Sequence, residues 1–295
     1  MWLQTLPPFN PVANGVRSTL QVPQVAATLG RVVLQFPTVP ANSITKATIS
    51  EIVVKIGSRV VFGPISGLEL DKLNKYRGLY DSAEFLTIDF TERDGLSRVY
   101  KEIGGIDLPA LGNRDVFVEV VNTAGAGNPY LTAIAGMTEL QVRPQGARAA
   151  GRQQQRNERR DQLMHKVLKY IVPSNGGTLQ TWMPDFRGAI VKRVHFAYAG
   201  TDWTATADGN LKQVLVRKNG LAIHDNIRCL FNRSIQQEQR KVPQSRMYHL
   251  DFVADNVYEA ALDTRNARTL QFDLSLTAND SVTAFVEVYD IPNNL

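Results

Sequence analysis

Apolar and polar residues alternate along much of the chain, in runs of four to seven residues. Clear examples are residues 116–120, 270–274 and 282–288. A period of two sends successive side chains to opposite faces of an extended strand, so that one face is buried and the other is exposed. Turn residues recur at short spacing, and no long amphipathic helices alternate with the strands. The pattern predicts an all-β protein built from sandwiches and argues against a parallel α/β sheet.

The segment 52–94 has a counterpart later in the chain. It reads as strand, two-residue turn, strand, short helix and strand, and the same order returns without a gap in 214–256, at a shift of 162 (214 − 52). The turn Gly57-Ser58 falls on Asn219-Gly220, and both pairs contain residues that tolerate the positive φ of a hairpin turn. Only five of the 43 aligned positions are identical. The prediction of a duplicated domain therefore rests on the registration of turns, helices and strands.

Further strands can be matched outward from this segment. Upstream, the shifts are 150, 147 and 146 for three pairs of short strands: 19–23 with 169–173, 31–37 with 178–184, and 44–46 with 190–192. The jump to 162 predicts about 16 additional residues (162 − 146) in the second half, in the small, polar, glycine-bearing loop 199–210. Downstream, the shift falls to about 154, which predicts an additional loop at 95–112 in the first half.

Each half then holds roughly eight strands and one helix in about 145 residues. Eight strands in a two-sheet sandwich of this size form a jelly roll. We therefore predict an all-β fold of two tandem eight-stranded jelly rolls, each with a short helix. The expected organisation is an N-terminal arm at 1–18, a first jelly roll at 19–142, a basic linker at 143–168 and a second jelly roll at 169–295.

The N-terminal arm carries candidate contact residues. Trp2 and Leu3 precede a segment rich in proline, which removes backbone donors and blocks helix formation, so the arm is expected to be extended. Two interpretations remain open for it. The arm packs along its own domain, or it reaches a neighbouring subunit or an anionic surface, with Arg17 as a further contact residue.

The net charge of +5 is concentrated in the linker. Eight basic and two acidic residues between 143 and 169 give +6, which leaves −1 (5 − 6) for the rest of the chain. This distribution excludes a broad nucleic-acid-binding face. The linker is either a solvated connector or a contact for phosphate groups of lipid or nucleic acid, because arginine forks suit phosphate oxygens. Its candidate residues are Arg148, Arg152, Arg156, Arg159 and Arg160.

The titratable residues form no recognisable catalytic set. The four histidines lack the paired spacing of a metal site or of a two-domain cupin, and His249 is expected at a surface or strand edge. Cys229 is the single cysteine and is expected to be a buried packing thiol. Asp89 and Asp251 occupy matched positions and are weak candidates for structural calcium, although a solvated strand face is the favoured explanation. We expect no enzyme activity and no cofactor beyond such an ion.

Two tandem jelly rolls, each with a helix after a tight hairpin, and no active site resemble the double jelly-roll major capsid proteins of tailless DNA viruses with an internal membrane. The chain looks most like the small capsid proteins of the corticovirus and autolykivirus type. The resemblance covers residues 19–291 and rests on architecture and length more than on a motif. Its most family-like stretches are 212–231 and 247–290.

This resemblance implies a viral coat protein that is synthesised in the host cytoplasm and located in the virion. It implies homotrimers with six sandwiches in a pseudo-hexagonal footprint, which tile an icosahedral shell over a lipid bilayer. The implied partners are neighbouring capsomers, other capsid proteins and membrane phospholipid headgroups, with no sequence-specific nucleic acid. The loops 95–112 and 200–210 become candidates for the outer surface or for contacts between subunits.

Two other classes of protein remain open from the sequence. A tandem carbohydrate- or receptor-binding module would need exposed aromatic residues, for which Trp203 in the loop 199–210 gives thin support. An enzyme on the same fold would need paired carboxylates, and the sequence spacing does not demand that arrangement. The residues available for it are Glu84, Asp89, Asp251 and Asp255. The capsid interpretation is favoured over both.

Overall fold

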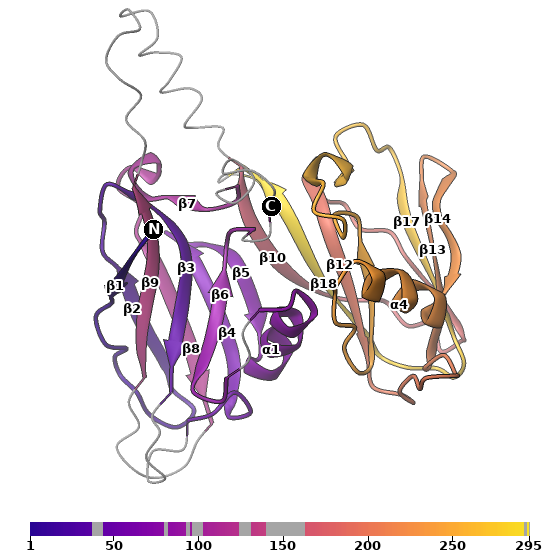
Figure 1. Cartoon of the computed structure of the whole chain (residues 1–295), viewed down its shortest axis with the longest axis horizontal. Helices are drawn as coiled ribbons and strands as arrows, with labels where there is room; N and C mark the ends of the chain where they lie inside the picture. The colour runs from indigo at the N-terminus through magenta and orange to yellow at the C-terminus, as the bar shows by residue number, and fades with distance from the viewer. Residues whose placement is uncertain are drawn as a thin grey trace, which may run out of the picture. The chain divides into compact units, whose positions relative to one another are not determined.

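The structure is a computed structural model that describes residues 1–36, 44–79, 82–92, 95, 103–123, 131–139, 163–291 and 294. Strands predominate in it, and the helices α1 (Gly67–Tyr76) and α4 (Cys229–Glu238) have ten residues each (Figure 1). The chain divides into two compact units: 1–74 with 80–166 and 290–293, and 75–79 with 167–289 and 294–295. In the part of the chain that is described, no helix is long and apolar enough to cross a membrane.

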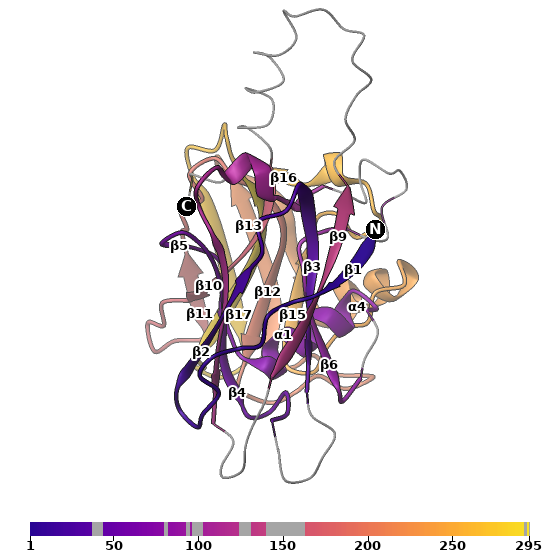
Figure 2. The same ribbon diagram turned by 90° about the vertical axis from the view of Figure 1, so that its left-hand side faces the viewer.

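The first unit is a sandwich of two antiparallel layers of strands (Figures 1 and 2). One sheet has the order β1 (Trp2–Thr5), β9 (Thr132–Glu139), β3 (Ala27–Gln35) and β6 (Phe85–Asp89). The other has the order β2 (Arg17–Val22), β8 (Val116–Asn122), β4 (Ile49–Ile56) and β5 (Arg59–Ile65). The short strand β7 (Ile106–Asp107) also pairs with β3, and the 3-10 helix η1 (Leu108–Leu111) follows it.

The hydrophobic pattern places the core between these two sheets. In β8, Val116, Val118 and Val120 are buried, whereas the residues between them are partly exposed, so the alternation predicted for this stretch is confirmed. Leu29 and Val32 of β3 are fully buried as well. Burying each such side chain contributes about 1.5–3 kcal/mol, so the alternation fixes which face of each strand turns inward.

Local side-chain hydrogen bonds define where each helix begins. Before α1, the backbone N–H of Ser66 donates to Glu69 (2.8 Å) and the backbone N–H of Glu69 donates to the Ser66 hydroxyl (3.3 Å), which is a capping box. Helix α4 has no cap from its preceding residue. Instead, the carboxylate of Asp208 accepts the backbone N–H of Leu230 at 2.9 Å. The loop before β13 therefore supplies the missing acceptor for α4.

The second unit is a sandwich with the same topology. One sheet has the order β10 (Met164–Ile171), β18 (Val282–Asp290), β12 (Ile190–Tyr198) and β15 (Met247–Asp251), with the short β16 (Leu262–Asp263) also beside β12. The other has the order β11 (Leu179–Trp182), β17 (Leu270–Leu276), β13 (Leu211–Lys218) and β14 (Leu221–Arg228). The 3-10 helix η2 (Tyr258–Ala260) precedes β16. Aromatic rings fill the core, where Trp182 and Phe272 lie with ring centroids 5.2 Å apart.

The strand order confirms the predicted pair of eight-stranded jelly rolls. Strands β1, β9, β3 and β6 correspond to β10, β18, β12 and β15, and the second sheets correspond in the same way. Helix α1 begins at Gly67 and α4 at Cys229, a shift of 162 (229 − 67) that also relates β4 to β13 and β6 to β15. The shift from β8 to β17 is 154 (270 − 116), as predicted.

The predicted insertion at 199–210 is wrong. Strand β3 corresponds to β12, and these nine-residue strands are related by a shift of 163 (190 − 27), not by 146 to 150. The connections that follow them, 36–48 and 199–210, are nearly equal in length, so the second half contains no additional loop there. The error arose because strand ends carrying proline were matched, although proline only marks where a strand stops.

Candidate functional site

The candidate residues of the N-terminal segment lie on an edge strand. Strand β1 pairs with β9 through Trp2↔Met137 and Leu3↔Gly136, so residues 2–5 belong to the first sandwich and do not form an arm outside it. The side chains of Trp2 and Leu3 are 40% and 62% exposed. Their strand is the last of its sheet, so an apolar pair is displayed along a sheet edge.

The candidate Arg17 is engaged within its own unit. Its guanidinium donates to Glu119 (2.6 Å) and to Glu51 (2.7 Å). The hydrogen bond to Glu119 is the main reason why the pKa of Arg17 is raised. Burial works to raise the pKa of Glu119, but hydrogen bonds from Lys55 and Arg17 lower it overall. A phosphate partner would have to displace these carboxylates, so Arg17 is a poor anion contact as it stands.

The linker candidates cannot be placed in the same way. Arg148, Arg152, Arg156, Arg159 and Arg160 lie in the segment 140–162, outside the described residues.

The matched aspartates do not lie on a solvated strand face, and that expectation is wrong. Asp89 is 2% exposed and the side chain of Asp251 is 1% exposed. Asp89 accepts hydrogen bonds from the backbone N–H (3.2 Å) and hydroxyl (3.1 Å) of Thr91. Asp251 accepts from the guanidinium of Arg193 at 3.0 Å. Among the described residues, no group of three or more metal-ligating side chains is assembled.

Each aspartate stands opposite an arginine across the strand pair. Arg31 pairs with Asp89 between β3 and β6, and Arg193 pairs with Asp251 between β12 and β15. Both arginines follow a register irregularity in their strand, and the shift of 162 relates one pair to the other (193 − 31 and 251 − 89). The duplicated feature is therefore an arginine–aspartate pair beside a bulge, of which the sequence pattern had revealed only the acid.

In the second unit this pair belongs to a larger buried polar cluster. His195 and His249 face each other across β12 and β15, with their Nδ1 atoms 2.6 Å apart. Nε2 of His195 lies 3.1 Å from Glu287 of β18, whose second oxygen accepts from Arg193 at 2.9 Å. Both histidines are at most 1% exposed, so the expectation of a surface His249 is wrong, although β15 is the last strand of its sheet.

The hydrogen bonds of the cluster run in one direction. The backbone N–H of Gln244 donates to Nε2 of His249 (3.2 Å), which places the proton of His249 on Nδ1. That proton is donated to Nδ1 of His195, whose own proton on Nε2 is donated to Glu287. In this arrangement each of the four ring nitrogens has a hydrogen-bond partner.

Tyr76 closes the cluster from the segment Lys75–Leu79, which clusters with the second unit. Its ring stacks on His249 with centroids 4.0 Å apart, and its hydroxyl donates to Asp251 at 3.0 Å. Burial, followed by the neighbouring Asp251, raises the pKa of Tyr76 well above its usual value. The phenol therefore remains a neutral donor, and the cluster has a structural rather than a catalytic character.

Sequence reasoning missed this cluster because its members are far apart in the chain. His195 and His249 are 54 residues apart, and Glu287 is 92 residues from His195. A usable signal was nevertheless present. Continued upstream without a gap, the shift of 162 places Arg31-Val32 on Arg193-Val194. This match would have identified β3 and β12 as equivalent strands.

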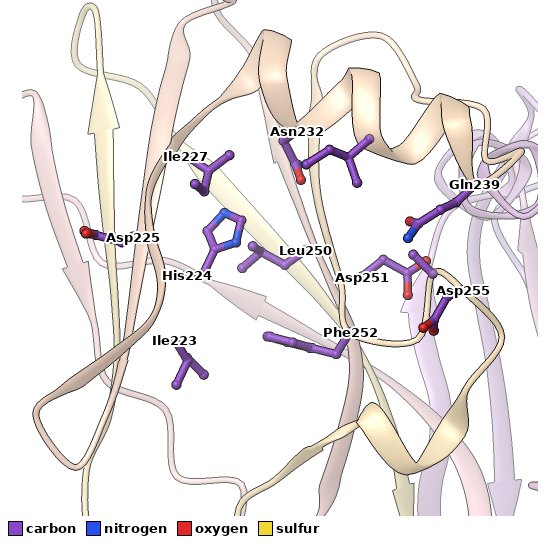
Figure 3. Close-up of a pocket in the computed structure, with 12 residues that line it drawn as sticks. Ile223, His224, Asp225, Ile227, Asn232, Gln239, Leu250, Asp251, Phe252 and Asp255 are labelled. Carbon is purple, nitrogen blue, oxygen red and sulfur yellow. The ribbon is translucent and has the colours of Figure 1, made fainter.

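A groove of about 420 Å³ opens to the surface of the second unit between β14, α4 and β15 (Figure 3). Ile223, Ile227 and Phe252 give it apolar walls, and Figure 3 shows the Asp225 side chain pointing away from the other lining residues. His224 also lines the groove, and its Nε2 lies 2.9 Å from the Tyr248 hydroxyl. Burial lowers the pKa of His224 to about 4. The Tyr248 hydroxyl in turn donates to the carbonyl of Ile227 at 2.8 Å, so the contact of His224 belongs to the packing of the sandwich.

The loop tryptophan does not form an open aromatic platform. The indole Nε1–H of Trp203 donates to the carbonyl of Gln244 at 3.1 Å, and the guanidinium of Arg233 lies 3.3 Å from the ring centroid. One face of the ring is therefore covered by a cation. This removes the support that Trp203 gave to a carbohydrate-binding module.

Solved structures of viral capsids share this architecture. The major capsid protein P2 of bacteriophage PM2 superposes with a TM-score of 0.74 at 16% identity, over 100% of this chain and 99% of that chain. Sulfolobus turreted icosahedral virus gives 0.69 at 14% identity, over 99% and 91%. The PBCV-1 virus capsid gives 0.60 at 10% identity, over 98% and 92%. These superpositions establish the double jelly-roll fold. At identities this low they show the fold alone.

Two tandem jelly rolls are the architecture that this chain shares with these viral shell proteins. The chain belongs to the viral coat protein P2 family. The model of that family's N-terminal domain matches residues 3–142, and the model of its C-terminal domain matches 164–292. It is therefore a coat protein of the virion's capsid shell and not an enzyme. No curated protein sequence matches the chain.

Proposed function

We propose that three copies of this chain form a homotrimer whose six sandwiches make a pseudo-hexagonal capsomer. The observation that carries the proposal is the duplication, because both units have the same strand order in both sheets. Three copies of a two-module chain supply six modules of one architecture. A head-to-tail contact repeated with closure forms a ring, so each module can use similar surfaces toward its neighbours.

Exposed apolar side chains on the surface of both units could form such contacts. Large apolar side chains are strongly exposed on both units, and isolated exposure is ordinary whereas clustered exposure marks interaction sites. The most exposed described examples are Met1 (72%), Leu3 (62%), Ile171 (79%), Met183 (67%) and Leu221 (71%). These capsomers would tile an icosahedral shell, in contact with neighbouring capsomers and with other capsid proteins.

We further propose that the basic linker, predicted at 143–168, contacts phospholipid headgroups of an internal membrane. The support is the charge of +6 over residues 143–169, beside a body of nearly zero charge. Each lysine or arginine near an anionic surface contributes about 1 kcal/mol, so five arginines give substantial binding at low salt. With β1 seated in a sheet, Trp2 and Leu3 are better placed to contact a neighbouring subunit than a membrane.

The trimer is tested by light scattering on the purified chain. The expected mass is three times 32.8 kDa, and a stable monomer across the accessible concentration range would overturn the proposal. Headgroup contact is tested separately with vesicles containing anionic lipid. Replacing Arg148, Arg152, Arg156, Arg159 and Arg160 by glutamine should abolish salt-sensitive binding, whereas the control replacement of Arg246 and Arg268 by glutamine should not. Equal loss in both variants would refute a specific role of the linker.

A further inference from the structure

Several residues that line the groove of the second unit are more exposed than the equivalent residues of the first unit. Because the shift of 162 relates β5 and α1 to β14 and α4, each lining residue has a known counterpart. Val61 is 1% exposed, and its counterpart Ile223 is 39% exposed. Leu73 is 3% exposed, and its counterpart Ile235 is 37% exposed. The same positions are thus interior in one module and open in the other.

A third apolar position of the groove differs in the same way. Phe90 is fully buried, whereas its counterpart Phe252 is only partly buried and lines the groove. These three positions remain apolar in both modules, whereas the buried Phe62 and Leu70 have the polar counterparts His224 and Asn232 in the groove. Retaining isoleucine and phenylalanine at open positions is unfavourable for an isolated module. The second unit therefore has the composition of a module whose groove is covered.

The strand beside the groove has a free edge. Strand β14 is the last strand of its sheet, with β13 as its neighbour, and no other described strand pairs with it. Leu221 at its start is 71% exposed. An exposed edge strand with apolar side chains is a ready template for another chain, and natural proteins usually protect such edges. Figure 3 shows Gln239 and Asp255 at one end of the groove, which gives the apolar walls a polar rim of the kind found at protein interfaces.

We propose that the groove formed by β14, α4 and β15 receives the first unit of a second copy of this chain. The proposal rests on the capsomer proposed above, since six modules in a ring alternate between first and second units. A second unit must then adjoin the first unit of another copy. The counterpart surface is the edge strand β1, because it is the last strand of its sheet and displays Trp2 and Leu3 at 40% and 62% exposure, directly after Met1 at 72%.

The first experiment places a charge in the groove. Ile235→Lys changes a partly exposed side chain, so the module should fold, as circular dichroism and an unchanged melting temperature will verify. The dissociation concentration of the trimer, measured by light scattering on dilution, should rise at least tenfold. The matched control is Leu179→Lys, which alters an exposed residue (54%) on β11, at the opposite edge of the same sheet. Equal behaviour of the two variants would overturn the proposal.

The second experiment identifies the partner surface. Leu3→Cys and Ile223→Cys proteins are mixed and oxidised, with Leu3→Cys plus Leu179→Cys as the control mixture. A disulfide needs the two Cα atoms within about 7 Å, so covalent dimers in the first mixture alone would support β1 as the occupant. Dimers in neither mixture, or equally in both, would refute it. A monomeric wild type would instead refute the capsomer itself, whereas an intact trimer of the Ile235→Lys variant would refute only this interface.

Discussion

The partly buried imidazole of His224 should make the second sandwich sensitive to acid. Its Nε2–H donates to the Tyr248 hydroxyl, which itself donates to the carbonyl of Ile227 at 2.8 Å. Burial is the main reason why the folded pKa of His224 is lowered from 6.5 to about 4, and the nearby Asp225 opposes this only weakly. The perturbation that isolates this effect is His224→Gln, which retains a hydrogen-bond donor and removes the titration.

The sign of the effect follows from the two pKa values. Between pH 6.5 and about 4 the unfolded chain binds a proton at His224 and the folded chain does not, so stability falls as the pH falls through this window. Each pKa unit corresponds to about 1.36 kcal/mol, which gives an upper bound of about 3 kcal/mol across the window. By pH 5.0 about 2 kcal/mol should already be lost relative to pH 7.5.

Urea unfolding at pH 7.5 and 5.0, followed by tryptophan fluorescence, measures this loss. Trp182 and Trp203 both lie in the second unit, so the signal reports mainly on that unit. Protein concentration must be held constant, because association shifts the apparent stability. The loss between the two pH values should be about 2 kcal/mol smaller in His224→Gln than in the wild type. Asn226→Gln, on the same strand, should retain the wild-type loss. The reasoning fails if His224→Gln and the wild type lose stability equally.

Three further predictions concern stability at pH 7.5, each measured as a change in the free energy of unfolding from urea curves. Glu287→Gln leaves the buried Arg193 without one of its two acids and should cost about 3–5 kcal/mol. Asp263→Asn, in an ion pair at the surface, should leave the midpoint unchanged. A cost below about 1 kcal/mol for Glu287→Gln would contradict the assigned cluster. Asp208→Ala removes the hydrogen-bond acceptor for the first turn of α4 and should cost about 1–2 kcal/mol. Asp225→Ala on β14 is the control and should leave the free energy of unfolding unchanged. Equal effects of the two variants would show that the cap is not stabilising. Phe272→Ala removes a core side chain packed against Trp182 and should cost about 3–5 kcal/mol. Phe231→Ala, at a 58% exposed site, should change the free energy of unfolding little. A small loss in both variants would contradict the core packing of Phe272.

The sequence determined the parts of the fold that depend on local chemistry. Hairpin turns at Gly57 and Asn219, the capping residues before α1 and the apolar alternation of β8 are all visible in short windows. A shift of 162 applied to such features located equivalent strands and helices correctly from β4 to β6. The matching failed upstream, where it relied on proline at strand ends. Proline marks where a strand ends, but it does not identify which strand of the other module is equivalent.

The buried polar residues of the second unit could not be predicted from short sequence windows. Alternation predicts a solvated face only where one side of a strand is exposed, but Met247, Tyr248, His249 and Leu250 of β15 are all buried. The polar residues on such a strand cannot reach water, so they must find partners across the sheet. Those partners come from β12 and β18, and only the strand register brings them together.

A comparison of the two modules separates what the fold requires from what one position in the chain requires. The arginine–aspartate pair beside the bulge occurs at the same place in both modules, Arg31 with Asp89 and Arg193 with Asp251, so it belongs to the shared architecture. The positions of His195, His249 and Glu287 are occupied in the first unit by Val33, Thr87 and Gly136, which cannot form the same hydrogen-bonded chain. The groove differs in the opposite way at Val61/Ile223, Leu73/Ile235 and Phe90/Phe252, which remain apolar although their burial differs. A duplicated module can lose a polar cluster without losing its fold. It retains apolar residues at open positions when another surface covers them, which is why the groove, and not the cluster, identifies where copies meet.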